Sequence, residues 1–111
     1  MNNTDPELLD MAAKALGREC RWFGAECRLQ RPDRLWELWS PLTSDGDGAR
    51  LEAALRVEII WYQTSAHAQA FDDRGTPVSQ GVFEAYADHN GDKQAARRRA
   101  SVRAAASLAQ S

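Results

Sequence analysis

The 111-residue chain has two cysteines and two histidines, residue types that ligate metal ions and act in nucleophilic catalysis: Cys20, Cys27, His67 and His89. Zinc sites and Cys–His catalytic pairs are built from such side chains. No two of them have the short spacing of a CxxC or HxxxH motif, and no glycine elbow or oxyanion loop accompanies either cysteine. The sequence therefore predicts a protein that is not an enzyme and holds neither a metal ion nor a cofactor.

A second arrangement with chemical potential is Asp45-Gly-Asp47-Gly, which resembles the start of a calcium-binding EF-hand loop. The third ligand position of such a loop would fall on Ala49, and the bidentate glutamate position would fall on Arg56. Neither residue can ligate calcium. Asp45 and Asp47 are instead expected to accept hydrogen bonds from free N–H groups at a helix start.

The C-terminal segment is the most basic part of a chain whose formal net charge is only -2. Five bases and a single acid, Asp92, follow residue 90; the bases are Lys93, Arg97, Arg98, Arg99 and Arg103. On a helix, Arg98 and Arg99 flank a stripe of small apolar residues, where arginine stems commonly pack along a neighbouring sheet. The structural role is the favoured interpretation, and phosphate contacts by these five residues are the alternative.

Local signals predict an α+β fold in one compact domain, residues 1–111, with an antiparallel sheet covered by helices as in an α/β/α-type sandwich. Capping residues predict helices from Thr4 or Asp5 to Gly17, over 47–55, and after Asp92. Strand patterns occupy 19–29, 34–39, 56–63, 66–71 and 78–86, with a turn at Asp72–Gly75. The first strand segment predicts a hairpin turning at Phe23 and Gly24, with the thiols of Cys20 and Cys27 as a direct cross-strand pair.

Two blocks carry a family resemblance, WSPLTSDGDGARL at Trp39–Leu51 and ARRRASVRAAASL at Ala96–Leu108. In this order they resemble the small tailed-phage proteins of the phage "ABA sandwich" domain family, whose pattern is roughly WNPLxDDGDALRL followed by RRAIVRAAAEI. Ser40, Gly48 and Ser101 depart from that pattern. The resemblance implies a layered fold and a viral origin, and it implies no reaction.

Tryptophan placement suggests where a partner could bind. Trp39 and Trp61 are expected in the core, whereas Trp36 lies on the opposite strand face from Trp39 and Trp22 lies near the hairpin tip. Exposed tryptophans are enriched at protein interfaces. The predicted partner surface comprises Trp22, Trp36, Asp72, Asp73 and Arg74.

These observations lead to two functional hypotheses. The first is a phage- or prophage-encoded, non-enzymatic protein that binds and inhibits a host protein, such as a component of an antiviral defence system like CRISPR. The alternative is a nucleic-acid-associated accessory protein that uses the basic last helix. The N-terminus lacks the pattern of a signal peptide and no apolar run could span a bilayer, so we expect the host cytoplasm and no membrane contact. Self-association as a homodimer stays open.

Overall fold

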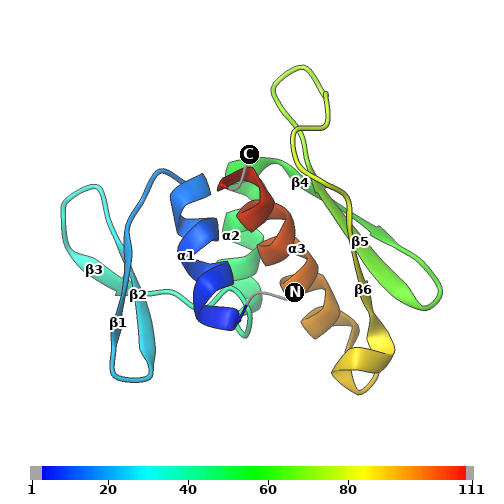
Figure 1. Cartoon of the computed structure of the whole chain (residues 1–111), viewed down its shortest axis with the longest axis horizontal. Helices are drawn as coiled ribbons and strands as arrows, with labels where there is room; N and C mark the ends of the chain where they lie inside the picture. The colour runs from blue at the N-terminus through cyan, green and yellow to red at the C-terminus, as the bar shows by residue number, and fades with distance from the viewer. Residues whose placement is uncertain (1–3, 110–111) are drawn as a thin grey trace.

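The computed structural model, which describes residues 4–109, has three α-helices in the middle and a three-stranded antiparallel sheet on each side (Figure 1). The helices are α1 (Asp5–Ala15), α2 (Asp45–Leu55) and α3 (Lys93–Ala109), and a short 3-10 helix, η1, spans Tyr86–His89. The first sheet has the order β1 (Cys20–Phe23), β2 (Glu26–Gln30), β3 (Trp36–Leu38). The second has the order β4 (Val57–Trp61), β5 (Ser65–Ala70), β6 (Val82–Ala85).

The predicted α+β class is confirmed, but the layers are arranged differently from the α/β/α expectation. Helices do not cover both faces of one sheet; two small sheets flank a central helical layer. The cause lies in α3, which is buried on several sides. Its Val102 and Ala105 belong to the core shared with α1, whereas Ala100 and Ala104 pack against the second sheet. Between Ala100 and Ala106 the only charged residue is Arg103, so this part of the helix can bury small side chains on more than one side.

Local signals define helix α1 as predicted. Thr4 is the N-cap, and its side chain forms a reciprocal capping box with Glu7. At the other end, Gly17 adopts a positive φ of 72°. The N–H of Gly17 donates to the carbonyl of Lys14 (2.9 Å), and the N–H of Arg18 donates to that of Ala13 (3.0 Å). These two bonds form a Schellman motif, which ends the helix.

The start of α2 differs from the prediction. Ser44 is the N-cap, and its hydroxyl accepts from the Asp47 N–H at 3.2 Å, so the helix begins two residues earlier than expected. Asp47 instead accepts from the N–H of Ser40 (2.9 Å), which holds the preceding turn against the helix. The predicted cap of α3 is confirmed, since the Asp92 carboxylate accepts from the Ala95 N–H at 3.1 Å.

The first hairpin turns one residue later than predicted. Its loop is Gly24-Ala25, which pairs Cys20 with Leu29 and Trp22 with Cys27, so the expected direct pairing of the two cysteines is wrong. Gly24 has a φ of 65° and takes the first loop position, where a type II′ turn requires glycine. Moving the turn by one residue shifts the pairing of the two strands by two positions, so Cys20 and Cys27 stay on one face as diagonal neighbours. Both cysteines are free thiols.

The second sheet follows the predicted order of strands; β4 and β6 are shorter than predicted, and β5 has the predicted length but begins one residue earlier. Its turn at Asp72–Gly75 is confirmed: Asp72 accepts from the backbone N–H groups of Arg74 and Thr76, both at 2.9 Å. The β5 residues Ala66, Ala68 and Ala70 face α3 and are fully buried. Small side chains at these positions let the helix approach the sheet closely.

The tryptophans divide differently from the prediction. Trp39 is 5 % exposed and lies in the core between α1 and the first sheet, as predicted. Trp61 is 46 % exposed, so its predicted core position is wrong. It is the last residue of β4, an edge strand, and only the ring of Tyr86 at 6.4 Å flanks it among the aromatic side chains of residues 4–109.

Candidate protein-binding surface

The basic residues of α3 are engaged in ion pairs inside the molecule. Arg97 donates two hydrogen bonds to the Glu52 carboxylate, from Nε at 3.0 Å and from Nη2 at 2.5 Å. Arg98 donates to the backbone carbonyl of Leu42 (2.9 Å) and to Asp45 (2.5 Å). These bonds attach α3 to α2 and to the turn before it.

The other two arginines of the helix, Arg99 and Arg103, are held in the same way. Arg99 donates to Asp5 at 2.6 Å, and Arg103 donates to the nearly buried Glu84 at 2.6 Å. Glu84 also accepts a bond from His89 at 2.9 Å if that ring nitrogen carries the proton. Lys93 lies 5.4 Å from the ring centre of Tyr86. Because the arginines already have carboxylate partners, the helix offers few free cations to a phosphate backbone.

The four residues with ligand or nucleophile chemistry do not converge. His67 is half-buried on β5, as expected of a strand residue, and His89 lies in η1 beside Glu84. Cys20 donates to Asp10 at 3.0 Å, and burial, reinforced by that carboxylate, raises the pKa of the Cys20 thiol. Burial also raises the pKa of Cys27. Within residues 4–109 no three His, Cys, Asp or Glu side chains are grouped as a metal site would require.

The first sheet turns one face toward the helices and one face away from them (Figure 1). Cys27 and Leu29 point into the core, so their strand neighbours point outward. We define the β1–β3 outer face as the outward side chains of this sheet that are aromatic, aliphatic or arginine: Arg21, Phe23, Arg28, Trp36 and Leu38. Trp36 therefore lies on the opposite face from Trp39, as predicted.

Aromatic and arginine side chains interleave on the β1–β3 outer face. Phe23 and Trp36 meet edge to face with ring centres 6.1 Å apart. The Arg21 guanidinium lies 5.1 Å from the Trp36 ring centre, and that of Arg28 lies 5.4 Å from Phe23. Phe23 is 49 % exposed and Leu38 is 59 % exposed. The sheet thus presents a semi-rigid apolar surface to solvent.

The charges on this face are balanced locally. Arg21 pairs with Glu19 at 3.1 Å, and Arg28 pairs with Glu26 at 3.0 Å. The Nε atom of Arg28 is buried and has no hydrogen-bond partner among the described residues. An unmet buried donor is costly, and a carbonyl oxygen of a bound molecule could satisfy it if the side chain turned outward.

The predicted partner residues do not form one surface. Trp22 lies on β1 on the same face as Cys27, which is the helix side, although it is 41 % exposed at the hairpin end. Asp72, Asp73 and Arg74 lie in the turn of the other sheet, on the far side of the helical layer (Figure 1). Asp72 holds that turn, and Asp73 pairs with Arg56 at 3.4 Å. Of the predicted set, Trp36 alone belongs to the β1–β3 outer face.

A second exposed apolar face was not predicted from the sequence. On the outward side of β4–β6, three rings form a cluster: the ring centre of His67 lies 4.6 Å from that of Phe83 and 6.4 Å from that of Tyr62, and those of Phe83 and Tyr62 are 5.7 Å apart. Ile60, opposite His67, is also exposed. In the sequence of β5, alanines alternate with His67 and Gln69, which indicates which face of the strand points outward. This alternation does not show that aromatic side chains of β4 and β6 meet on that face.

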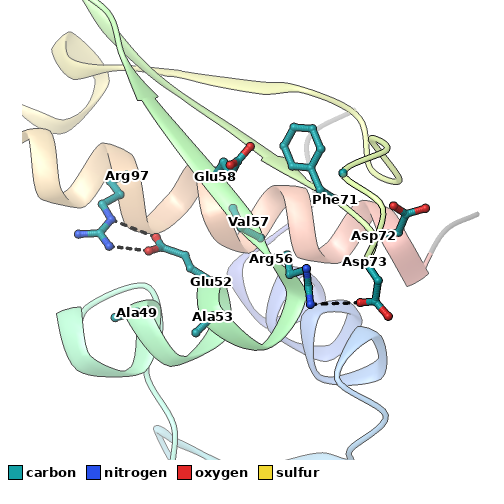
Figure 2. A pocket seen from close by; sticks show the side chains of 11 residues that line it. Ala49, Glu52, Ala53, Arg56, Val57, Glu58, Phe71, Asp72, Asp73 and Arg97 are labelled. Carbon is teal, nitrogen blue, oxygen red and sulfur yellow. Dashed lines mark hydrogen bonds and ion pairs between the residues drawn. The ribbon is translucent and has the colours of Figure 1, made fainter.

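A groove of about 850 Å³ runs between α2 and the second sheet (Figure 2). Ala49 and Ala53 of α2 border it on one side, and Val57 and Glu58 of β4 border it on the other. The Glu52–Arg97 and Arg56–Asp73 ion pairs close its two ends, as the dashed lines show. Four of the charged side chains that line the groove are thus already paired with one another.

No family model, curated protein or solved structure matches the chain. The resemblance to the phage "ABA sandwich" family therefore stays a prediction. None of the helices within residues 4–109 is long and apolar enough to cross a membrane.

Proposed function

We propose that the chain is a non-enzymatic binding protein that engages another protein through the β1–β3 outer face. The observation that carries this proposal is the contact between the exposed Phe23 and the half-buried Trp36, flanked by Arg21, Arg28 and the exposed Leu38. Trp, Arg and aromatic side chains dominate the binding energy of protein interfaces. A sheet also holds these side chains in fixed positions, which lowers the entropy lost on binding.

Charge favours a protein over a nucleic acid as the partner. Both arginines of the face have a glutamate within about hydrogen-bond distance, Glu19 for Arg21 and Glu26 for Arg28. Protein surfaces that bind nucleic acids instead carry an excess of unpaired cationic side chains. The arginines of α3, which supported the nucleic-acid alternative, are bound to internal carboxylates.

The resemblance of the Trp39–Leu51 and Ala96–Leu108 blocks to phage proteins supports a phage or prophage origin. We therefore propose a host protein as the target, with inhibition of an antiviral defence component such as a CRISPR effector as the role. The resemblance supports this class of function.

The test is capture of partners from bacterial host lysate by the immobilised full-length chain, with and without nuclease. Trp36→Ala is compared with Trp22→Ala, which removes the same side chain from the other face of the same sheet. We expect a captured protein that survives nuclease and is lost with Trp36→Ala only. Capture abolished by nuclease, or lost equally in both variants, contradicts the proposal.

A further inference from the structure

The backbone of the second sheet is covered at one of its two edges and open at the other. At the β6 edge, the carbonyl of Phe83 accepts a hydrogen bond from Arg103 at 3.1 Å, so a side chain covers it. At the β4 edge, no hydrogen bond from elsewhere in residues 4–109 reaches the backbone of Val57, Ile59 or Trp61. Folded proteins normally protect such edges with charges, proline or bulges. In β4, Glu58 is the only charged side chain among Val57–Trp61.

The hydrogen-bond pattern shows which backbone groups β4 leaves open. The Tyr62 N–H donates to the Ser65 carbonyl (2.9 Å) at one end of the β4–β5 ladder, and the Phe71 N–H donates to the Arg56 carbonyl (3.1 Å) at the other. Bonded and non-bonded pairs alternate along an antiparallel ladder. Even-numbered residues from 56 to 62 therefore bond to β5. The backbone groups of Val57, Ile59 and Trp61 point to the open edge.

From this edge we infer that β4 pairs with β4 of a second copy of the chain, antiparallel and with the two-fold axis at Ile59. Only this register pairs all three open residues within the strand, Ile59 with its own copy and Val57 with Trp61 in both directions. A register centred on Glu58 places that carboxylate opposite itself, which is unfavourable. A register centred on Ile60 pairs Val57 with Gln63, beyond the end of β4.

Side chains across the proposed junction fit one another. On the outward face, Glu58 lies opposite Ile60 of the second copy in both directions, so no like charges meet. On the helix side, Trp61 of the second copy lies opposite Val57, beside the groove bordered by Ala49 and Ala53 (Figure 2). Small side chains there leave room for an indole ring that is 46 % exposed in the isolated chain. The junction also joins the two β4–β6 outer faces into one continuous sheet surface.

This pairing is tested on the full-length chain by sedimentation equilibrium from micromolar to millimolar concentration. We expect a concentration-dependent rise toward twice the 12.4 kDa chain mass. Trp61→Lys should raise the dimer dissociation constant at least about thirtyfold, because it removes a central aromatic contact and adds an edge charge. Phe83→Lys is the matched control, since it places the same charge at an exposed aromatic on the opposite edge strand, and it should leave the dimer intact.

Backbone pairing has its own readout in amide hydrogen exchange. The Ile59 N–H has no acceptor among residues 4–109, so in dilute solution it should exchange quickly, and in concentrated solution it should slow by at least roughly tenfold. Ile59→Pro removes this donor while leaving the bonds to β5, and it should give a folded monomer by circular dichroism. A chain that stays monomeric throughout, or a dimer lost with Phe83→Lys and kept with Trp61→Lys, overturns the inference.

Discussion

Arg97 of α3 and Glu52 of α2 form a two-point ion pair across 45 residues of sequence, at 3.0 and 2.5 Å. Ser101, one turn further along α3, donates to the same carboxylate at 2.5 Å. Glu52 is 8 % exposed, so these hydrogen bonds replace most of the contacts with water that its carboxylate would otherwise make. The hydrogen bonds that Arg97 donates to Glu52 raise the pKa of Arg97, so its guanidinium stays charged.

Glu52→Gln should therefore destabilise the protein far more than loss of a surface pair. It leaves the Arg97 charge without its partner, which costs about 3 kcal/mol, near the lower end of the range for buried pairs because Arg97 is partly exposed. Glu19→Gln, which breaks the exposed pair with Arg21, is the control and should cost less than about 1 kcal/mol. Urea unfolding monitored by circular dichroism gives both values. Equal costs for the two variants would show that the buried pair adds nothing.

The two buried cysteines should make the free energy of unfolding depend on pH in the alkaline range. Burial raises the pKa of Cys20 and of Cys27 in the folded chain, so the folded state keeps both thiols protonated where the unfolded state ionises. Their contribution is complete below the unfolded thiol pKa of about 8.5 and decreases as pH rises above it. The urea midpoint of the wild type should fall between about pH 8 and pH 10 more steeply than that of Cys20→Ser. Parallel curves for the two proteins would contradict this assignment.

Features that depend on neighbouring residues were predictable from the sequence. The Thr4–Glu7 capping box, the Asp92 cap and the Asp72 turn each involve residues a few positions apart. The predicted register of the first hairpin was wrong because Gly24 suits either position of a two-residue loop. Each position gives a complete ladder of hydrogen bonds between the two strands. Nothing local separates the two choices.

Features that depend on distant residues were not predictable. Arg99 and Asp5 pair across 94 residues, so the arginines of α3 could be assigned to a face but not to partners. The layer order was missed for a related reason: an alanine-rich helix gives little indication of which side is buried, and α3 is buried on several. For the candidate surface, alternation placed Trp36 outward. The strand pairing that brings Phe23 and Arg21 to it follows only from the sheet.

Trp36→Ala should separate binding from stability. The side chain lies on the face of the first sheet that points away from the core residues Cys27 and Leu29, so its removal should leave the thermal midpoint nearly unchanged. Truncation of an interface tryptophan costs about 2 kcal/mol or more in binding. This corresponds to a loss of affinity for the captured partner of roughly thirtyfold. Calorimetry on the captured partner and a thermal melt measure the two quantities. A large drop in the thermal midpoint would assign Trp36 to the fold and remove it from the interface.

Duplex DNA and RNA should bind weakly at physiological ionic strength. Arg97, Arg98, Arg99 and Arg103 would have to exchange internal carboxylates for phosphates, which leaves Glu52 and Glu84 unpaired. Fluorescence anisotropy across a salt series tests this, because each neutralised phosphate contributes a slope of about -0.9 to log K against log salt. Tight binding with a slope equivalent to several phosphates, reduced in Arg99→Ala, would favour the nucleic-acid function instead.

Gly48→Ala should stabilise the protein. Gly48 lies inside α2, where glycine costs roughly 0.5–1 kcal/mol relative to alanine. An added Cβ would stand 3.4 Å from the Pro41 carbonyl and 3.6 Å from the Arg98 Cγ, which are ordinary contact distances. The phage-like pattern has alanine at this position, so the substitution also tests whether the local geometry fits that pattern.

Gly24→Ala is the control and should destabilise, because Gly24 has open space around it but a positive φ of 65°. A loss of stability in Gly48→Ala would mean that the turn at Pro41 and α2 are packed too closely for a methyl group, and the fit to the phage-like pattern would fail at that residue.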